Sequence, residues 1–189
     1  MSYQKHQTIE FLSKYKVKGS VLDIGGGENP VKGMVKWKAK KYLIADNNKK
    51  LKPDILWDIN KVAAEIGFYE MGEINNFNWV FFLGTMSYVY NLKQALHNAY
   101  HMLKKGGTLI TNSTFIYPYH DKKEYCHQTP HGFIRLLKEI GFRIKRKKYI
   151  KLSKEAFKYY KKMCKADGLF MHPDLNHRIA GVIIEAKKE

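Results

Sequence analysis

Three consecutive glycines follow an apolar stretch and an aspartate near the start of the chain. In the segment VLDIGGGENP, Asp23 comes shortly before Gly25, Gly26 and Gly27. Glycine tolerates positive φ and has no Cβ, so another molecule can approach the backbone of such a turn closely. A glycine turn at the end of a strand, beside a carboxylate, is therefore a candidate binding site.

Two more carboxylates end the next two apolar segments. Asp46 closes KYLIAD, about twenty residues after the glycine turn, where an acidic side chain accepts hydrogen bonds from ribose hydroxyls. Asp58 closes DILWD, and Gly84 closes the apolar run NWVFFLG. In open α/β sheets, ligands bind beyond the carboxyl ends of the strands. The spacing therefore predicts a nucleoside-type ligand at this edge.

A dinucleotide is a poorer match to the same residues. The G-x-G-x-x-G pattern fits at Gly25 and Gly27, but its third position is Pro30. Residues 31–41 leave little room for a long helix whose N-terminus would receive a pyrophosphate. The residues favour a ligand without one.

The elements that must position these residues alternate along the chain. A continuous apolar run such as NWVFFLG is typical of a buried parallel strand, and helical spacing marks the intervening segments. Strands are expected at residues 20–26, 41–46, 54–58, 78–84, 108–115, 142–153 and 178–186. Helices are expected at residues 8–15, 92–107, 130–140 and 154–166. This order predicts one α/β domain, residues 1–189, with a mostly parallel sheet.

Local signals set several of the expected boundaries. Asn91 is a candidate N-cap, and KKGG is expected to end that helix with a basic turn and a glycine stop. Thr129 and Pro130 should start the next helix, and Gly141 should end it. KRKK, residues 145–148, is expected on an edge strand, where lysines prevent edge pairing, although it could also contact phosphates.

The terminal helices are less tightly specified. An N-terminal helix is expected within residues 1–18, and a helical insertion within residues 153–176 before the last strand. The helix at 154–166 is expected to pack on the sheet with its lysines in water; a substrate lid or a membrane-surface contact is the alternative.

Composition limits the environment and the partners. The chain has no apolar stretch long enough to span a membrane and no signal-peptide pattern, and its two cysteines suggest a reducing compartment, so cytoplasm is expected. The formal net charge of +17 attracts nucleic acid, anionic lipid or acidic glycans. The charge comes mostly from scattered lysines, and codon bias or adaptation to heat is an alternative source of a lysine-rich surface, so nucleic acid is possible but not favoured.

From Val21 onward, the chain resembles class I S-adenosylmethionine-dependent methyltransferases. VLDIGGGENPVKG is similar to their first motif, and YLIAD, PDILWDIN and NWVFFLG follow in the family's order. NLKQALHNAYHMLKKGGTLITNSTF is similar to the segment around LKPGG. EYCHQTPHGFIRLLKEIGF is similar to DYWRFTPEGLRRLLEEAGF of small methyltransferases found with polysaccharide and lipid-sugar biosynthesis. The resemblance implies a Rossmann-like sheet of seven strands, mostly parallel with an antiparallel last strand, and helices on both faces.

The resemblance also assigns the glycine turn. Gly25, Gly26 and Gly27 would line the methionine portion of S-adenosylmethionine, and Asp23 would anchor the turn. Asn29 takes the place of the last glycine of the motif, and asparagine tolerates the left-handed conformation better than most residues.

The remaining cofactor contacts fall on the other strand ends. Asp46, with Asn47 beside it, would bind the ribose hydroxyls. Asp58 and the backbone of Ile59 would meet the adenine, and the backbone of Gly84 would border the sulfonium. No C-x-x-C or H-x-x-H pair occurs, so no metal is expected.

The acceptor side departs from the family pattern. The family's LEHV reads MSYV at residues 86–89, and its DYWRFT reads EYCHQT at residues 124–129. Histidine is the natural general base near pH 7, which makes His120 and His127 the candidate catalytic residues. Tyr88 is a candidate wall of the acceptor pocket.

The sequence leaves three functions open. The first is methyl transfer to an oxygen or nitrogen of a small molecule, a sugar or a lipid-linked glycan. The second is a nucleic-acid (RNA) methyltransferase, favoured by the charge but lacking an N-P-P-Y type tetrapeptide after the fourth strand. The third is a non-catalytic cofactor-binding or partner-binding module, favoured by the altered loops.

Overall fold

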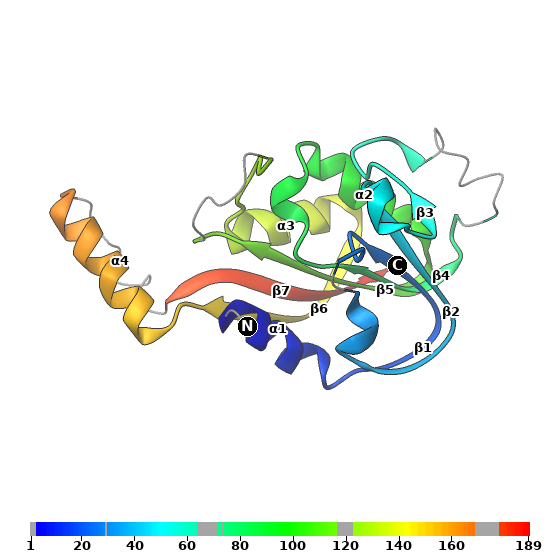
Figure 1. The fold of residues 1–189 in the computed structure, drawn as a ribbon, viewed down its shortest axis with the longest axis horizontal. Helices are drawn as coiled ribbons and strands as arrows, with labels where there is room; N and C mark the ends of the chain where they lie inside the picture. Colours follow the sequence, from blue (N-terminus) through cyan, green and yellow to red (C-terminus); the bar gives the residue numbers. More distant parts are fainter. Residues whose placement is uncertain (1–2, 29, 64–71, 73, 117–122, 169–177) are drawn as a thin grey trace.

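The computed structural model describes residues 3–28, 30–63, 72, 74–116, 123–168 and 178–189 (Figure 1). One seven-stranded sheet with the order β3-β2-β1-β4-β5-β7-β6 forms its centre. The strands are β1 (Lys16–Ile24), β2 (Lys36–Asp46), β3 (Ile55–Leu56), β4 (Phe77–Phe82), β5 (Leu103–Thr114), β6 (Phe142–Lys151) and β7 (Ile179–Lys188). The α-helices are α1 (Tyr3–Leu12), α2 (Leu92–Met102), α3 (Pro130–Ile140) and α4 (Lys154–Ala166). The short 3₁₀ helices are η1 (Val31–Gly33), η2 (Lys49–Leu51) and η4 (Met86–Tyr88).

The pairing of the strands confirms the expected sheet. Strands β1 to β5 pair in parallel, so β1, β2, β3 and β4 all end at one edge. Strand β7 runs antiparallel to both β5 and β6. The basic strand β6 lies at the outer edge, as its alternating sequence predicted.

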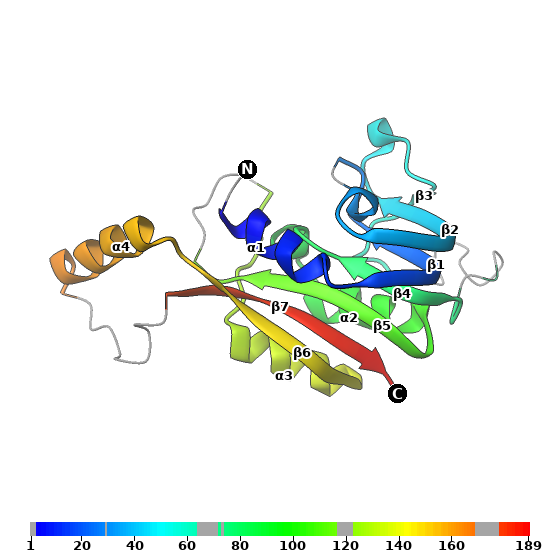
Figure 2. The same cartoon turned by 90° about the horizontal axis from the view of Figure 1, so that it is seen from below.

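Helices cover both faces of the sheet, as expected (Figure 2). Helices α2 and α3 pack on one face, where Leu96, Phe133 and Leu137 join the larger apolar core. Helix α1 lies on the other face, where Phe11 and Leu12 join a smaller core. Both cores form because alternate strand residues point to opposite faces.

The capped helices begin where the sequence predicted. The side chain of Asn91 accepts a hydrogen bond from the Gln94 amide, and that of Thr129 accepts one from the Gly132 amide. Gly141 ends α3 with φ of 110°, a conformation that favours glycine.

Two expected helix boundaries were wrong. In both cases, residues near the expected helix end pair with a neighbouring strand instead. Helix α1 ends at Leu12, since β1 already starts at Lys16 and pairs with Lys36 of a longer β2. Helix α2 ends at Met102 instead of continuing into KKGG, because Leu103 is extended and pairs with Phe77 of β4.

Helix α4 does not pack on the sheet, contrary to the first expectation (Figure 1). The last residue of β5, Thr114, pairs with Gly181, whereas β6 ends farther along, at Lys151, opposite Ile179. Helix α4 therefore starts beyond the end of β5 and extends away from the sheet in both views.

Candidate cofactor site at the carboxyl ends of the strands

The glycine turn is held by side chains from three neighbouring segments. Gly25 has φ of +73°, and its amide donates to the Ala45 carbonyl at 2.7 Å. A Cβ at Gly25 would clash with the Thr85 side chain, and one at Gly26 would lie 2.5 Å from the Asp23 carboxylate. At Gly27 it would lie 2.6 Å from Leu51 Cδ1. At all three positions, the close approach of neighbouring side chains leaves no room for a Cβ unless a neighbour shifts.

Asp23 lies beneath this turn with a relative exposure of 1%. Its Oδ2 accepts hydrogen bonds from the Tyr42 hydroxyl at 2.6 Å and from the Val31 amide at 2.8 Å. Burial raises the pKa of Asp23 to about 6, although both hydrogen bonds oppose the shift. Asp23 therefore ties the turn to β2 and η1, as an anchoring role requires.

The raised pKa makes stability depend on pH. An unfolded aspartate has a pKa of about 3.9. Between about pH 3.9 and about pH 6, Asp23 holds a proton in the folded state that it has lost in the unfolded state. This proton stabilises the folded state. The stabilisation is complete below about pH 3.9 and is lost as pH rises through about 6. Asparagine stays neutral at both pH values. In Asp23→Asn, the fall in unfolding free energy from about pH 4.5 to about pH 7 should therefore be about 2 kcal/mol smaller than in the wild type.

Urea unfolding of both proteins at the two pH values measures this difference. Both proteins contain the same other carboxyls, so the difference between their pH dependences reports on position 23. An identical pH dependence in both proteins would remove Asp23 as its source.

Asp46 stands at the end of β2, directly beside the glycine turn. Its Oδ2 accepts from the Gly27 amide at 3.2 Å, and its Oδ1 accepts from the Asn48 amide at 2.9 Å. Each carboxylate oxygen has a second lone pair, so the group retains the capacity to accept two hydroxyl hydrogens. Asn47 is exposed next to it.

Asp58 and Ile59 form the next part of this edge, after β3. The Oδ1 of Asp58 accepts from the amide and the side chain of Asn60, at 3.1 and 2.8 Å. The Asn60 side chain in turn accepts from the Asn91 amide at 3.1 Å. Ile59 is buried, and its carbonyl accepts from the Nδ2 of Asn98 at 2.8 Å.

Asn98 of α2 is a supporting residue that the sequence analysis missed. It is 1% exposed and donates to the carbonyls of Ile59 and Lys61, both at 2.8 Å. Its Oδ1 accepts from the Ala63 amide at 3.3 Å. The available signal was an asparagine directly beside Ala99 of the buried helix face, a place where a polar side chain needs partners.

Gly84 and Thr85 complete the edge after β4. Gly84 has φ of +71°, and its amide donates to the Oδ1 of Asn112 on β5 at 2.9 Å. The Thr85 hydroxyl donates to the Leu83 carbonyl at 3.0 Å. Gly84 thus lies on the same edge as the glycine turn, with Thr85 between them.

The two loops predicted to face the acceptor contact each other. The amide of Tyr125 donates to the carbonyl of Ser87 at 2.6 Å, and the Cys126 thiol lies 3.5 Å from the Met86 carbonyl. Above this contact, the rings of Tyr90 and Tyr125 meet edge to face with centroids 5.7 Å apart, each more than 60% exposed. The structure therefore joins Tyr88, within η4, to the loop of His127.

His127 lies near a buried acid. Its Nε2 is 3.8 Å from the Oε1 of Glu124, whose side chain is 3% exposed, whereas that of His127 is 23% exposed. His127 is therefore partly open to solvent beside a shielded carboxylate. His120 and Asn29, both predicted site residues, lie outside the described residues.

The described residues hold no group of three histidine, cysteine or acidic side chains arranged to bind a metal ion. Within these residues, no helix has the length and apolar character needed to cross a membrane.

Comparison with known proteins shows the fold. No family model matches the chain, and a search of curated proteins gave no match either. Among solved structures, an S-adenosylmethionine-dependent methyltransferase from Mesorhizobium loti is 12% identical with a TM-score of 0.65 over 98% of both chains. A methyltransferase from Archaeoglobus fulgidus is 16% identical with a TM-score of 0.58, over 97% of this chain and 90% of the other.

A third structure carries the cofactor. Phosphoethanolamine N-methyltransferase 2 from Haemonchus contortus, solved with S-adenosyl-L-methionine, is 13% identical with a TM-score of 0.56, over 98% of this chain and 52% of the other. Together with the strand order, these similarities show the Rossmann-like fold of class I methyltransferases, as the sequence motifs predicted.

Proposed function

We propose that this chain is an S-adenosylmethionine-dependent methyltransferase acting on an oxygen or nitrogen of a small molecule, a sugar or a lipid-linked glycan. The observation that carries the proposal is the convergence of Asp23, the glycine turn and Asp46 at one sheet edge, on a fold shared with such enzymes.

The chemistry of these residues suits the cofactor. S-adenosylmethionine carries a sulfonium and an ammonium, and when bound it supplies an electrophilic methyl group. Positive charge nearby favours the ionised form of Asp23, which burial otherwise disfavours. The lone pairs left on Asp46 would accept the ribose hydroxyls, and Asp58 with the Ile59 backbone would bind the adenine. The backbone of Gly84 would border the methyl group.

The acceptor side would supply orientation and a base. Methyl transfer is an in-line displacement, so most of the rate acceleration comes from aligning the acceptor atom. Tyr88 would form one wall of the acceptor pocket. His127 would take the proton from the acceptor hydroxyl or amine, and His120 is the second candidate for that role.

Replacing Asp46 tests the cofactor site. Asp46→Ala should weaken S-adenosylmethionine binding in calorimetry about 10- to 100-fold, the cost of losing charge-assisted hydrogen bonds. Asp54→Ala is the matched control, because Asp54 also accepts a backbone hydrogen bond, from the Ile44 amide, but outside the proposed site. Equal affinity in the Asp46 variant and the wild type would remove Asp46 from the site.

RNA is the second candidate acceptor, favoured by the basic outer edge of the sheet described below. Transfer of labelled methyl groups separates the two acceptors. Label in glycan or lipid extracts supports the first candidate, and label in RNA supports the second. Cofactor binding without transfer to any extract would instead indicate the non-catalytic module.

A further inference from the structure

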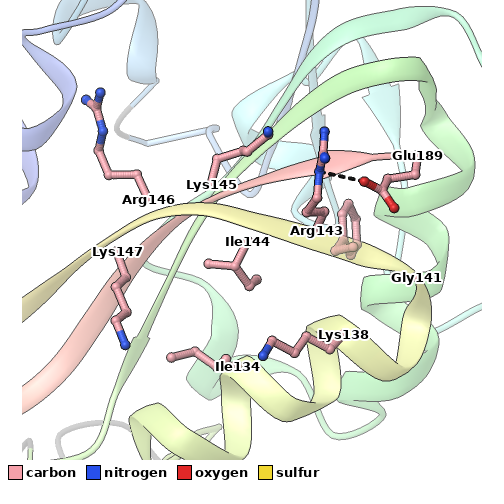
Figure 3. A pocket seen from close by; sticks show the side chains of 10 residues that line it. Ile134, Lys138, Gly141, Arg143, Ile144, Lys145, Arg146, Lys147 and Glu189 are labelled. Atoms are coloured by element: carbon pink, nitrogen blue, oxygen red, sulfur yellow. Dashed lines mark ion pairs between the residues drawn. The ribbon is translucent and has the colours of Figure 1, made fainter.

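The outer edge of the sheet carries a basic hollow (Figure 3). It has a volume of about 630 Å³ and lies where α3 meets β6. Its charged lining residues are Lys138, Arg143, Lys145, Arg146, Lys147 and Glu189. We refer to these six residues and the space between them as the basic groove.

Among the described residues, three of the five cations have no acidic partner. Arg143 pairs with Glu189 at 2.5 Å, and Arg146 lies 3.8 Å from Glu185. Lys138, Lys145 and Lys147 form no ion pair with any described residue. Side chains of like charge repel one another, so binding of an anionic partner in the groove would offset this repulsion.

Protection of the edge strand against pairing with another chain does not by itself explain the cations of the basic groove. Lys145 sits where the register between β6 and β7 shifts, a bulge that by itself blunts an edge strand. Lys138 comes from α3, not from the edge, and its side chain lies with that of Lys147 on the side of β6 that faces α3, whereas Lys145 projects from the other side of the strand (Figure 3). Protection against edge pairing explains the strand lysines but not the contribution of the helix.

The chemistry of the groove favours phosphates over a bilayer surface. Its large apolar lining residues are partly buried, Ile134 and Ile144, or buried, Phe142. Helices that bind membranes insert exposed apolar side chains beside their lysines. The large exposed apolar residues of the described chain all lie elsewhere: Leu56, Val62, Tyr90, Tyr125, Tyr159 and Met163.

The position of the groove favours a long ligand. Strand β6 is separated from β4 by β5 and β7, which places it roughly 14 Å from the cofactor edge at the usual strand spacing. Residues 141–147 also begin β6, which runs parallel to β5, so they lie toward the opposite end of the strands. A small acceptor bound there would not reach Gly84. A polymer is long enough to bind at the groove as well, and this additional contact would strengthen its binding.

We infer that the basic groove binds the phosphate backbone of a nucleic-acid strand, independently of base sequence. The inference goes beyond the proposed function, because it holds whichever acceptor is methylated. Phosphate contacts of this kind position a strand without reading its bases.

Fluorescence anisotropy with a labelled uridine oligonucleotide of roughly 20 nucleotides tests it, without cofactor. The test variant combines Lys138→Glu, Lys145→Glu and Lys147→Glu. The matched control combines Lys158→Glu, Lys161→Glu and Lys162→Glu on α4, all exposed, which changes the net charge equally. Circular dichroism melts confirm that both variants fold.

The groove variant should lose at least tenfold in affinity, and its salt dependence, log Kd against log salt, should flatten by about 2 for three lost contacts. The control should stay within about threefold of the wild type. Equal losses in both variants would mean a diffuse field and overturn the inference, as would no binding by the wild type. Binding to phosphatidylserine vesicles that the groove variant loses, with no oligonucleotide binding, would assign the groove to a lipid surface instead.

Discussion

Gly25→Ala is expected to lower the free energy of unfolding by about 3 kcal/mol and to disrupt cofactor binding. The left-handed conformation at φ of +73° costs a residue with a Cβ about 1–2 kcal/mol. The added methyl group would also collide with the Thr85 side chain, and relieving that overlap requires the loops after β1 and β4 to separate. Both effects distort the glycine turn, which we assign to the methionine portion of S-adenosylmethionine.

Gly84→Ala is the control that separates these two costs. Gly84 has nearly the same φ, +71°, but a Cβ there would meet no atom within 4 Å. Its variant should therefore lose only the conformational cost of about 1–2 kcal/mol. Urea unfolding followed by tryptophan fluorescence measures both changes. Equal losses would show that Thr85 does not confine the turn.

Asn98→Ala is the second large expected effect, a loss of about 3 kcal/mol in unfolding free energy. Truncation leaves the buried Ile59 carbonyl, the partly buried Lys61 carbonyl and the Ala63 amide without the partner that now satisfies them. Each unsatisfied buried group costs about 1–3 kcal/mol before relaxation. Because Ile59 is the predicted adenine contact, cofactor affinity should fall as well.

Lys93→Ala on the same helix controls for the change in helix propensity. Lys93 is exposed, so its replacement should change stability by less than about 0.5 kcal/mol. Retained stability together with retained cofactor affinity in the Asn98 variant would show that α2 does not hold the loop after β3.

Local signals predicted the α-helices and strands that the structure contains. Thr129, Pro130 and Gly141 set both ends of α3 through backbone groups only a few residues away. The boundary between α2 and β5 could not be predicted in this way, because Leu103 is extended by pairing with the distant Phe77. The same long-range pairing moved the start of β1 to Lys16.

The residues of the candidate site also fall into those that local sequence predicts and those that depend on distant contacts. The common position of Asp23, Asp46 and Asp58 was predictable, because each lies at or just after the end of an apolar strand and parallel strands end at a common edge. Asn98 was not, since its partners are more than thirty residues away along the chain. The basic groove also joins α3 to β6, and only the packing of one on the other shows that Lys138 belongs to it.

The place of β7 in the sheet has a consequence for synthesis. Strand β7 follows β6 in the chain but lies between β5 and β6. During translation, β6 therefore emerges with no neighbour to pair with, and the outer edge of β5 stays open until β7 has left the ribosome. Four of the ten residues of β6 are lysine and two are arginine, Arg143 and Arg146, so nascent chains at this stage repel one another instead of aggregating through their open edges.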